Sequence, residues 1–181
     1  AQLINNLQTI VSRNVNPTDS AVITITQIHA GNTWNAIPDS AVLRGTFRCF
    51  NGSVQTLIAD KIRQQVDAVC AAFGMQSELK FNPDNSGYPV TYNSDKEADL
   101  ALQAATAVVG VASVHTNPTP SMGSEDFAFM LQEKPGCYIW IGNGSSANSC
   151  LLHNPNYDFN DDILAVGASY WVKLVELGLA D

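Results

Sequence analysis

Hydrophobic residues recur every three or four positions in several stretches of the chain, a spacing typical of helices with one buried face. The pattern predicts helices at residues 2–14, 54–73 and 95–109, a short helix capped by Ser124 that ends before Pro135, and a last helix capped by Asn160. Gly74 and Gly110 are expected to end helices, since glycine readily adopts the left-handed conformation found at helix C-termini. The last helix should bury Ile163, Val166, Tyr170, Leu174 and Val175.

Alternation of apolar and polar residues predicts strands in the intervening stretches. Residues 21–28 and 41–50 are rich in β-branched and aromatic residues that alternate with polar ones. Shorter apolar runs predict further strands at residues 78–81, 111–114 and 137–142. The first 85 residues therefore have the order helix, strand, strand, helix, strand. One strand added in front would complete the β-α-β-β-α-β ferredoxin-like unit.

Turn-forming residues from Pro83 to Tyr92 separate this unit from the rest of the chain. We therefore predict two domains, residues 1–85 and 86–181, in an α+β or α/β protein. Ser94 and Glu97 have the spacing of a capping box, which would begin the first helix of the second domain.

Composition excludes several classes of function. The chain has 181 residues, of which 45% are hydrophobic and 14% charged, with a formal net charge of -8. This acidic balance argues against nucleic acids and anionic membrane surfaces as partners, because both require clustered Lys and Arg. The four cysteines show neither a CxxC pair nor metal-cluster spacing, so free thiols and a reducing cytoplasm are expected.

His153 lies in a polar stretch between the predicted strand at 137–142 and the last helix. Loops of this kind present ligating or catalytic groups. The alternative is a histidine that only stabilises a turn. His29 and His115 have no acidic partner nearby in the sequence, and we interpret both as structural. No GxSxG, HExxH or glycine-rich phosphate loop is present, so no nucleophile is visible.

Asn35 and Arg48 form a second candidate site, because the loop that holds Asn35 runs into the strand that holds Arg48. Both could project from one sheet edge, where an amide and a guanidinium would suit a carboxylate or carbonyl ligand. The alternative is a turn asparagine and a solvated arginine. Gly123 and Ser124 precede a predicted helix, where backbone N–H groups could bind an anion or Ser124 could simply cap the helix.

Five collinear segments together resemble the dinuclear metal amidohydrolases, in particular hippurate hydrolase, N-acyl amino acid amidohydrolases and plant auxin-conjugate hydrolases. They are residues 30–39 (AGNTWNAIPD), 43–48 (LRGTFR), 123–127 (GSEDF), 135–136 (PG) and 152–155 (LHNP). The resemblance implies that His153 is the last metal ligand. It implies that Asn35 and Arg48 are lid-domain residues that reach across a homodimer and hold the substrate. Gly123 and Ser124 would line the substrate pocket.

The same resemblance implies that part of the enzyme is missing. The family's other metal ligands and its glutamate base lie in an amino-terminal region with a Cys-x-His motif and a Glu-Glu pair, and this region is absent here. The chain would then be a ferredoxin-like lid that lacks its first strand, followed by the C-terminal part of an α/β catalytic domain. The first strand of such a sheet lies between the third and fourth, so the lid would have a gap.

The resemblance therefore implies that the chain is part of an enzyme that hydrolyses N-acyl amino acids or similar amides. The complete enzyme would use two divalent ions, such as zinc or manganese. A catalytic zinc needs about three protein ligands, so the chain alone should be inactive and contain no catalytic residue of its own. One alternative is a non-catalytic module for dimerisation and substrate recognition. Another is an α+β binding protein unrelated to hydrolases.

Overall fold

The computed structural model describes residues 1–81, 87–144 and 150–180. They form two compact units, Ala1–Val90 with Met122–Ser124, and Thr91–Ser121 with Glu125–Asp181. The predicted domain boundary between residues 85 and 86 lies outside the described residues. Helices and a small sheet make this an α+β structure, and within the described ranges no helix is long and apolar enough to cross a membrane.

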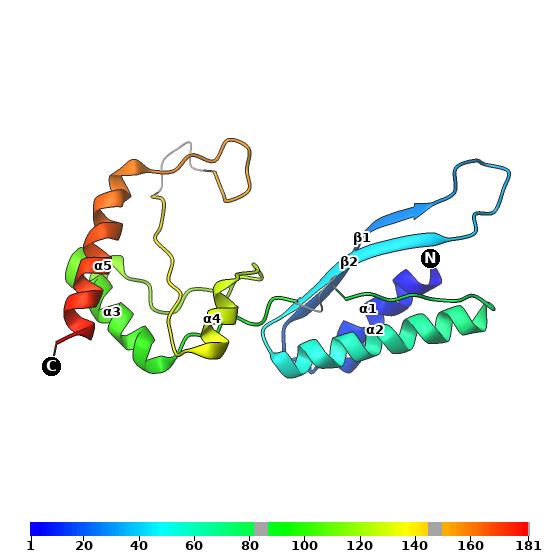
Figure 1. Cartoon of the computed structure of the whole chain (residues 1–181), viewed down its shortest axis with the longest axis horizontal. Helices are drawn as coiled ribbons and strands as arrows, with labels where there is room; N and C mark the ends of the chain where they lie inside the picture. The colour runs from blue at the N-terminus through cyan, green and yellow to red at the C-terminus, as the bar shows by residue number, and fades with distance from the viewer. Residues whose placement is uncertain (82–86, 145–149, 181) are drawn as a thin grey trace. The chain divides into compact units, whose positions relative to one another are not determined.

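The first unit packs two helices against a two-stranded antiparallel sheet (Figure 1). Its elements are α1 (Gln2–Asn14), β1 (Ala21–Ala30), β2 (Ala41–Cys49) and α2 (Gly52–Ala72). The strands pair from Ala21 opposite Cys49 to Ala30 opposite Ala41, with an irregularity between Ile25 and Gln27. These four elements agree with the hydrophobic pattern.

The core of the first unit lies between the sheet and the two helices. Ile10 of α1 and Ile58 of α2 are fully buried. The other buried residues of this core are Leu7, Val15, Ile23, Val54, Ile62 and Val66. Asn51 caps α2 by accepting a hydrogen bond from the Ser53 N–H at 2.9 Å. Gly74 follows α2 with φ +66°, which confirms its predicted role at the end of this helix.

The predicted strand at 78–81 is wrong, since the described residues of this segment form no strand. A strand needs a neighbour for its backbone groups, and in the described part of the first unit only β1 and β2 pair. Two side-chain contacts of Phe81 hold the described part of this segment in place. Phe81 packs edge-on against Phe47 with ring centroids 6.1 Å apart, and the Arg63 guanidinium lies 5.5 Å from the Phe81 ring centre.

The second unit is built around two helices that pack together, α3 (Asp95–Val109) and α5 (Leu164–Gly178). Its shorter elements are the 3-10 helices η1 (Val111–Ser113) and η2 (Asp161–Ile163) and the helix α4 (Phe127–Glu133). Ala101 and Ala104 of α3 are buried together with Tyr170 of α5. The small alanine side chains leave room for the large Tyr170 side chain to pack against α3.

Several predictions for the second unit are wrong. Residues 111–113 form η1 instead of a strand, and residues 137–142 form no strand. The helix expected to be capped by Ser124 begins at Phe127, with Asp126 at its N-cap position. Val175, predicted to be buried, is 56% exposed.

The predicted capping box of α3 does not form, although Ser94 occupies the N-cap position. The Ser94 hydroxyl instead accepts a hydrogen bond from the Gly136 N–H at 3.3 Å, and the Ser94 N–H donates to the Gly136 carbonyl at 2.9 Å. A tertiary contact has therefore replaced the local cap. It ties the start of α3 to the beginning of the extended segment at 137–142.

Truncation of the core of the first unit should be far more costly than truncation of an exposed side chain of the same type. Ile58→Ala is expected to lower the free energy of unfolding by about 2–5 kcal/mol, because it leaves a cavity in a closely packed site. Ile37→Ala is the matched control, since Ile37 is 96% exposed, and its effect should stay within about 0.5 kcal/mol. Urea denaturation followed by circular dichroism measures both. Equal losses would contradict the assignment of the core.

Candidate functional site

The loop that carries His153 makes a sharp turn at this residue. His153 has φ +68°, the only positive φ among the described non-glycine residues. The Asn154 N–H donates to the Leu151 carbonyl at 3.2 Å, and the Asn154 side chain accepts from the Asn156 N–H at 2.9 Å. A positive φ is uncommon outside glycine and often marks a functional constraint. The turn leaves His153 exposed, with its imidazole available to a ligand.

Two asparagines close the base of the His153 loop, and sequence reasoning missed this pair. The Asn143 side chain accepts a hydrogen bond from the Asn160 N–H at 2.7 Å and donates to the Asp158 carbonyl at 2.8 Å. Asn160 donates its own side-chain amide to the Asn143 carbonyl at 3.3 Å. We name these two residues the asparagine clasp. It joins the residue after the extended segment to the N-cap of η2, and so fixes both ends of the loop.

The structure does not bring Asn35 and Arg48 together within one chain. Asn35 lies in the connection between β1 and β2, where it accepts a hydrogen bond from the Thr33 hydroxyl at 2.8 Å. Arg48 lies at the opposite end of β2, paired with Val22. The seven residue steps from Ala41 to Arg48 span roughly 23 Å at the usual rise of a strand. Within one chain the two residues therefore lie near opposite ends of β2, and their shared role in binding a ligand stays a prediction.

Arg48 has a hydrogen-bond partner next to two other predicted site residues. Its Nη1 donates to the carbonyl oxygen of Met122, and Gly123 and Ser124 follow directly. This contact lies inside the first unit, to which Met122–Ser124 belongs. Of the five predicted site residues, Arg48, Gly123 and Ser124 are thus brought into one neighbourhood.

Glu125 and Tyr138 form a polar contact in the second unit that the sequence did not reveal. The Tyr138 hydroxyl donates to the Glu125 carboxylate, which also accepts from the Phe127 N–H at 3.3 Å. These hydrogen bonds lower the pKa of Glu125, with that from Tyr138 the largest cause, and the same contact raises the pKa of Tyr138. The Phe127 and Tyr138 rings also pack with centroids 5.7 Å apart. The contact therefore ties the start of α4 to the extended segment.

Asn93 holds the backbone of the same tyrosine. Its side-chain carbonyl accepts from the Tyr138 N–H at 2.8 Å, and its side-chain amide donates to the Tyr138 carbonyl at 2.9 Å. The Asn93 side chain thus makes the two backbone hydrogen bonds that a neighbouring strand would make with Tyr138. It keeps residues 137–142 extended without a sheet.

The described residues do not supply a complete metal site. No group of three or more His, Cys, Asp or Glu side chains within them could hold a metal ion. His153 can therefore provide one ligand at most. Cys137 is a poor candidate for a ligand or nucleophile, because burial, and then the charge of Glu97, raise the pKa of its thiol.

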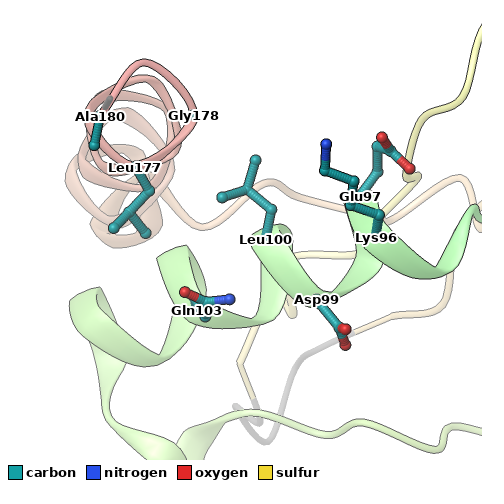
Figure 2. A pocket seen from close by; sticks show the side chains of 8 residues that line it. All are labelled: Lys96, Glu97, Asp99, Leu100, Gln103, Leu177, Gly178 and Ala180. Atoms are coloured by element: carbon teal, nitrogen blue, oxygen red, sulfur yellow. The ribbon is translucent and has the colours of Figure 1, made fainter.

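A groove at the C-terminal end of α5 contains none of the predicted site residues (Figure 2). Its volume is about 530 Å³, and it is lined by Lys96, Glu97, Asp99, Leu100, Gln103, Leu177, Gly178 and Ala180. Lys96 and Glu97 come from the first turn of α3. Charges of both signs line this groove, which gives it no clear preference for an anion or a cation.

Comparison with known proteins places nearly the whole chain within one family. Residues 6–177 match the model of peptidase family M20/M25/M40. The chain is 38% identical over 172 residues to the hippurate hydrolase of Campylobacter jejuni subsp. jejuni serotype O:2, covering 95% of this chain and 43% of that protein. It is 32% identical over 178 residues to the N-acetylcysteine deacetylase of Bacillus subtilis, covering 98% and 44%.

Solved structures agree with this placement. The YXEP protein of Bacillus subtilis, described as a dinuclear metal binding peptidase from the M20 family, superposes with a TM-score of 0.75 at 29% identity. The match covers 99% of this chain and 45% of that one. A putative aminohydrolase from Staphylococcus aureus shares the fold, with a TM-score of 0.78 at 23% identity. The chain thus spans less than half the length of the relatives it matches.

Removal of the Tyr138 hydroxyl should move the titration of Glu125. The depressed pKa of Glu125 means that its hydrogen bonds contribute to stability above the ordinary pKa of a glutamate and are lost as the pH falls through the depressed value. In Tyr138→Phe the pKa of Glu125 is expected to rise toward its ordinary value, as measured by carbon-13 NMR titration of the carboxylate. Tyr157→Phe, a control in the His153 loop, should leave this titration unchanged. An identical Glu125 pKa in wild type and Tyr138→Phe would refute the contact.

Proposed function

Because the chain belongs to peptidase family M20/M25/M40, we propose that it is the C-terminal part of a metal-dependent amidohydrolase. The observation that carries this proposal is the family match over residues 6–177. The names of the relatives, hippurate hydrolase and N-acetylcysteine deacetylase, support an N-acyl amino acid or a related amide as the substrate. The relatives are more than twice as long as the region they share with this chain, which supports a longer complete enzyme.

In this proposal residues 1–85 are the lid domain, of ferredoxin-like fold, and residues 86–181 are the end of the catalytic domain. The missing first strand of the lid would lie between β2 and the segment at 78–81. Two features of the first unit support this arrangement. In the described residues β2 pairs only with β1, and Phe81 packs on Phe47 of β2, so the unpaired segment lies beside the sheet.

His153 is the proposed ligand that this chain contributes to a site for two divalent ions. The turn at φ +68° and the asparagine clasp support this role, because they expose the imidazole on a loop with fixed ends. The remaining ligands and the glutamate base would come from the preceding part of the enzyme. In such enzymes bound metal ions activate a water molecule and polarise the scissile carbonyl.

Asn35, Arg48, Gly123 and Ser124 are the proposed substrate-binding residues, and the lid domain is the proposed homodimer interface. A guanidinium has five N–H donors, so the bond from Arg48 to the Met122 carbonyl leaves others for a substrate carboxylate. Arg48 could therefore hold the Gly123–Ser124 segment and the substrate together. Asn35 lies beyond the other end of β2 from Arg48. We therefore propose that Asn35 binds substrate in the active site of the partner subunit.

The second candidate function is a module for dimerisation and substrate recognition without activity of its own. The lack of a three-ligand group within the described residues favours this role for the isolated chain. The two candidates differ in the metal content and activity of the 181-residue chain compared with the full-length protein.

His153→Ala in the full-length protein is expected to lose one of two bound metal ions. It should also lower kcat by more than about 100-fold, because even the hydrogen-bond partners of metal ligands are worth about 10- to 100-fold. Metal analysis by mass spectrometry and an amide-hydrolysis assay measure the two effects. The 181-residue chain should show neither activity nor a tight two-metal site.

His115→Ala is the matched control for this variant, since His115 is also exposed, and it should behave as wild type. Normal metal content and turnover in His153→Ala would exclude its role as a ligand. Activity of the 181-residue chain with two bound metals would overturn the proposal that the other ligands lie outside it.

Arg48→Ala in the full-length protein should raise KM by about tenfold to a hundredfold for substrates with a free carboxylate, because a hydrogen bond to a charged group is lost. Amides without the carboxylate should be affected much less. Arg44→Ala, on the same strand, is the control and should leave both substrates unaffected. An equal loss on both substrates would instead assign Arg48 to support of the Met122 carbonyl.

A further inference from the structure

The β1–β2 hairpin extends beyond the core of the first unit (Figure 1). Ile23 is the last buried residue of β1, and we name residues 26–44 the hairpin arm. The structure describes every residue of the arm, and none of them is buried. Backbone pairing continues to Ala30 opposite Ala41, so the strands hold the arm together without a core. The end of the arm is therefore presented to groups outside the first unit.

The tip of the hairpin arm exposes two large apolar side chains. Trp34 and Ile37 are each 96% exposed, and no large apolar residue in the described ranges exceeds this value. Gly31 has φ +75°, and a Cβ atom there would lie 3.9 Å from Cγ of Pro38, so the two ends of the tip are close together. Trp34 and Ile37 are three residues apart, which limits the distance between their Cα atoms to about 11 Å. Both can therefore contact one small ligand.

Asn35 lies between these two residues in the sequence, and its neighbour orients it. Its side-chain oxygen accepts a hydrogen bond from the Thr33 hydroxyl at 2.8 Å. Within the described residues the side-chain N–H groups of Asn35 have no acceptor, so they can donate to a ligand. Residues 30–38 contain no charged side chain. A neutral amide donor beside apolar side chains suits a carbonyl with an apolar substituent better than a carboxylate, which binds most strongly to a charged donor.

The size of the tip favours a small ligand over a protein surface. A covered aromatic side chain contributes about 150–250 Å², whereas a stable protein interface buries about 800 Å² on each partner. Trp34 and Ile37 together fall short of that area. Two side chains can, however, cover a single phenyl ring or branched alkyl group, and an aromatic group gains further from packing on the indole ring.

Resting on the proposed function, in which Asn35 binds substrate in the active site of the partner subunit, we propose that Trp34 and Ile37 select the acyl group of that substrate. Asn35 donates to the acyl carbonyl, and the two apolar side chains contact the acyl substituent. The substrate class is an amide with a large apolar acyl group, such as benzoyl. A small acyl group such as acetyl makes few of these contacts. This division leaves the free carboxylate of the substrate to the guanidinium of Arg48.

Kinetics of the full-length protein with N-benzoylglycine and N-acetylglycine, which differ only in the acyl group, test this selection. The measured quantity is the ratio of kcat/KM for the benzoyl amide to kcat/KM for the acetyl amide. Trp34→Ala should lower this ratio at least tenfold, because an apolar contact in a pocket is worth about 10- to 200-fold. Trp34→Phe should keep most of the ratio, and Ile37→Ala should lower it less than Trp34→Ala does. Ile28→Ala is the matched control on the same arm, since Ile28 is 59% exposed, and it should leave the ratio unchanged.

An active enzyme in which Trp34→Ala lowers kcat/KM equally for both amides, or for neither, would overturn this inference and leave the proposed function intact. Light scattering should give the same oligomeric state for wild type and Trp34→Ala, and dissociation of the variant would assign the tip to a subunit interface instead. For a full-length protein that cleaves neither amide, calorimetry measures the Kd of each. Tighter binding of N-benzoylglycine that Trp34→Ala weakens at least tenfold would then uphold this inference while refuting the proposed function. Binding of neither amide would refute both.

Discussion

Backbone N–H and C=O groups need hydrogen-bond partners, and this requirement shapes both units of the chain. In the first unit β1 and β2 satisfy each other, and the segment at 78–81 lies beside them without a strand partner in the described residues. In the second unit the segment at 137–142 has the same apolar pattern as a buried strand, yet the Asn93 side chain supplies the only strand-like pairing described there. Each unit thus contains one segment whose backbone has no neighbouring strand in the described residues.

The helices could be predicted from the sequence because their hydrogen bonds are local. The spacing of Leu7, Ile10, Ile58 and Ile62 marks the buried faces, and Gly74 marks the end of α2. The strands at 78–81 and 137–142 could not be judged in the same way, because a strand depends on a neighbour that the pattern of one segment does not reveal. Val175 was misjudged because both sides of α5 are apolar, and periodicity alone does not say which side packs on α3.

The sequence indicates where the candidate site residues lie in the fold, while their roles stay predictions. The loop position of His153 follows from the turn residues around it, but its assignment as a metal ligand came from family resemblance alone. The asparagine clasp and the Glu125–Tyr138 contact join residues 17 and 13 positions apart in ordinary polar stretches. Nothing in their spacing distinguishes them from solvated surface residues. The separation of Asn35 from Arg48 follows from the length of the hairpin, since Asn35 lies in the connection that precedes β2 and Arg48 lies near the end of β2.

The asparagine clasp also makes the packing of α5 independent of the length of the His153 loop that precedes it. Because Asn143 and Asn160 are joined directly, the end of the extended segment and the start of η2 keep their distance whatever lies between them. The entropy cost of closing a loop rises only by about 0.6 kcal/mol for each doubling of its length. Insertions or deletions between the two asparagines should therefore alter the reach and surroundings of the histidine with little effect on the packing of α5. The length of this loop can therefore change while the fold stays the same.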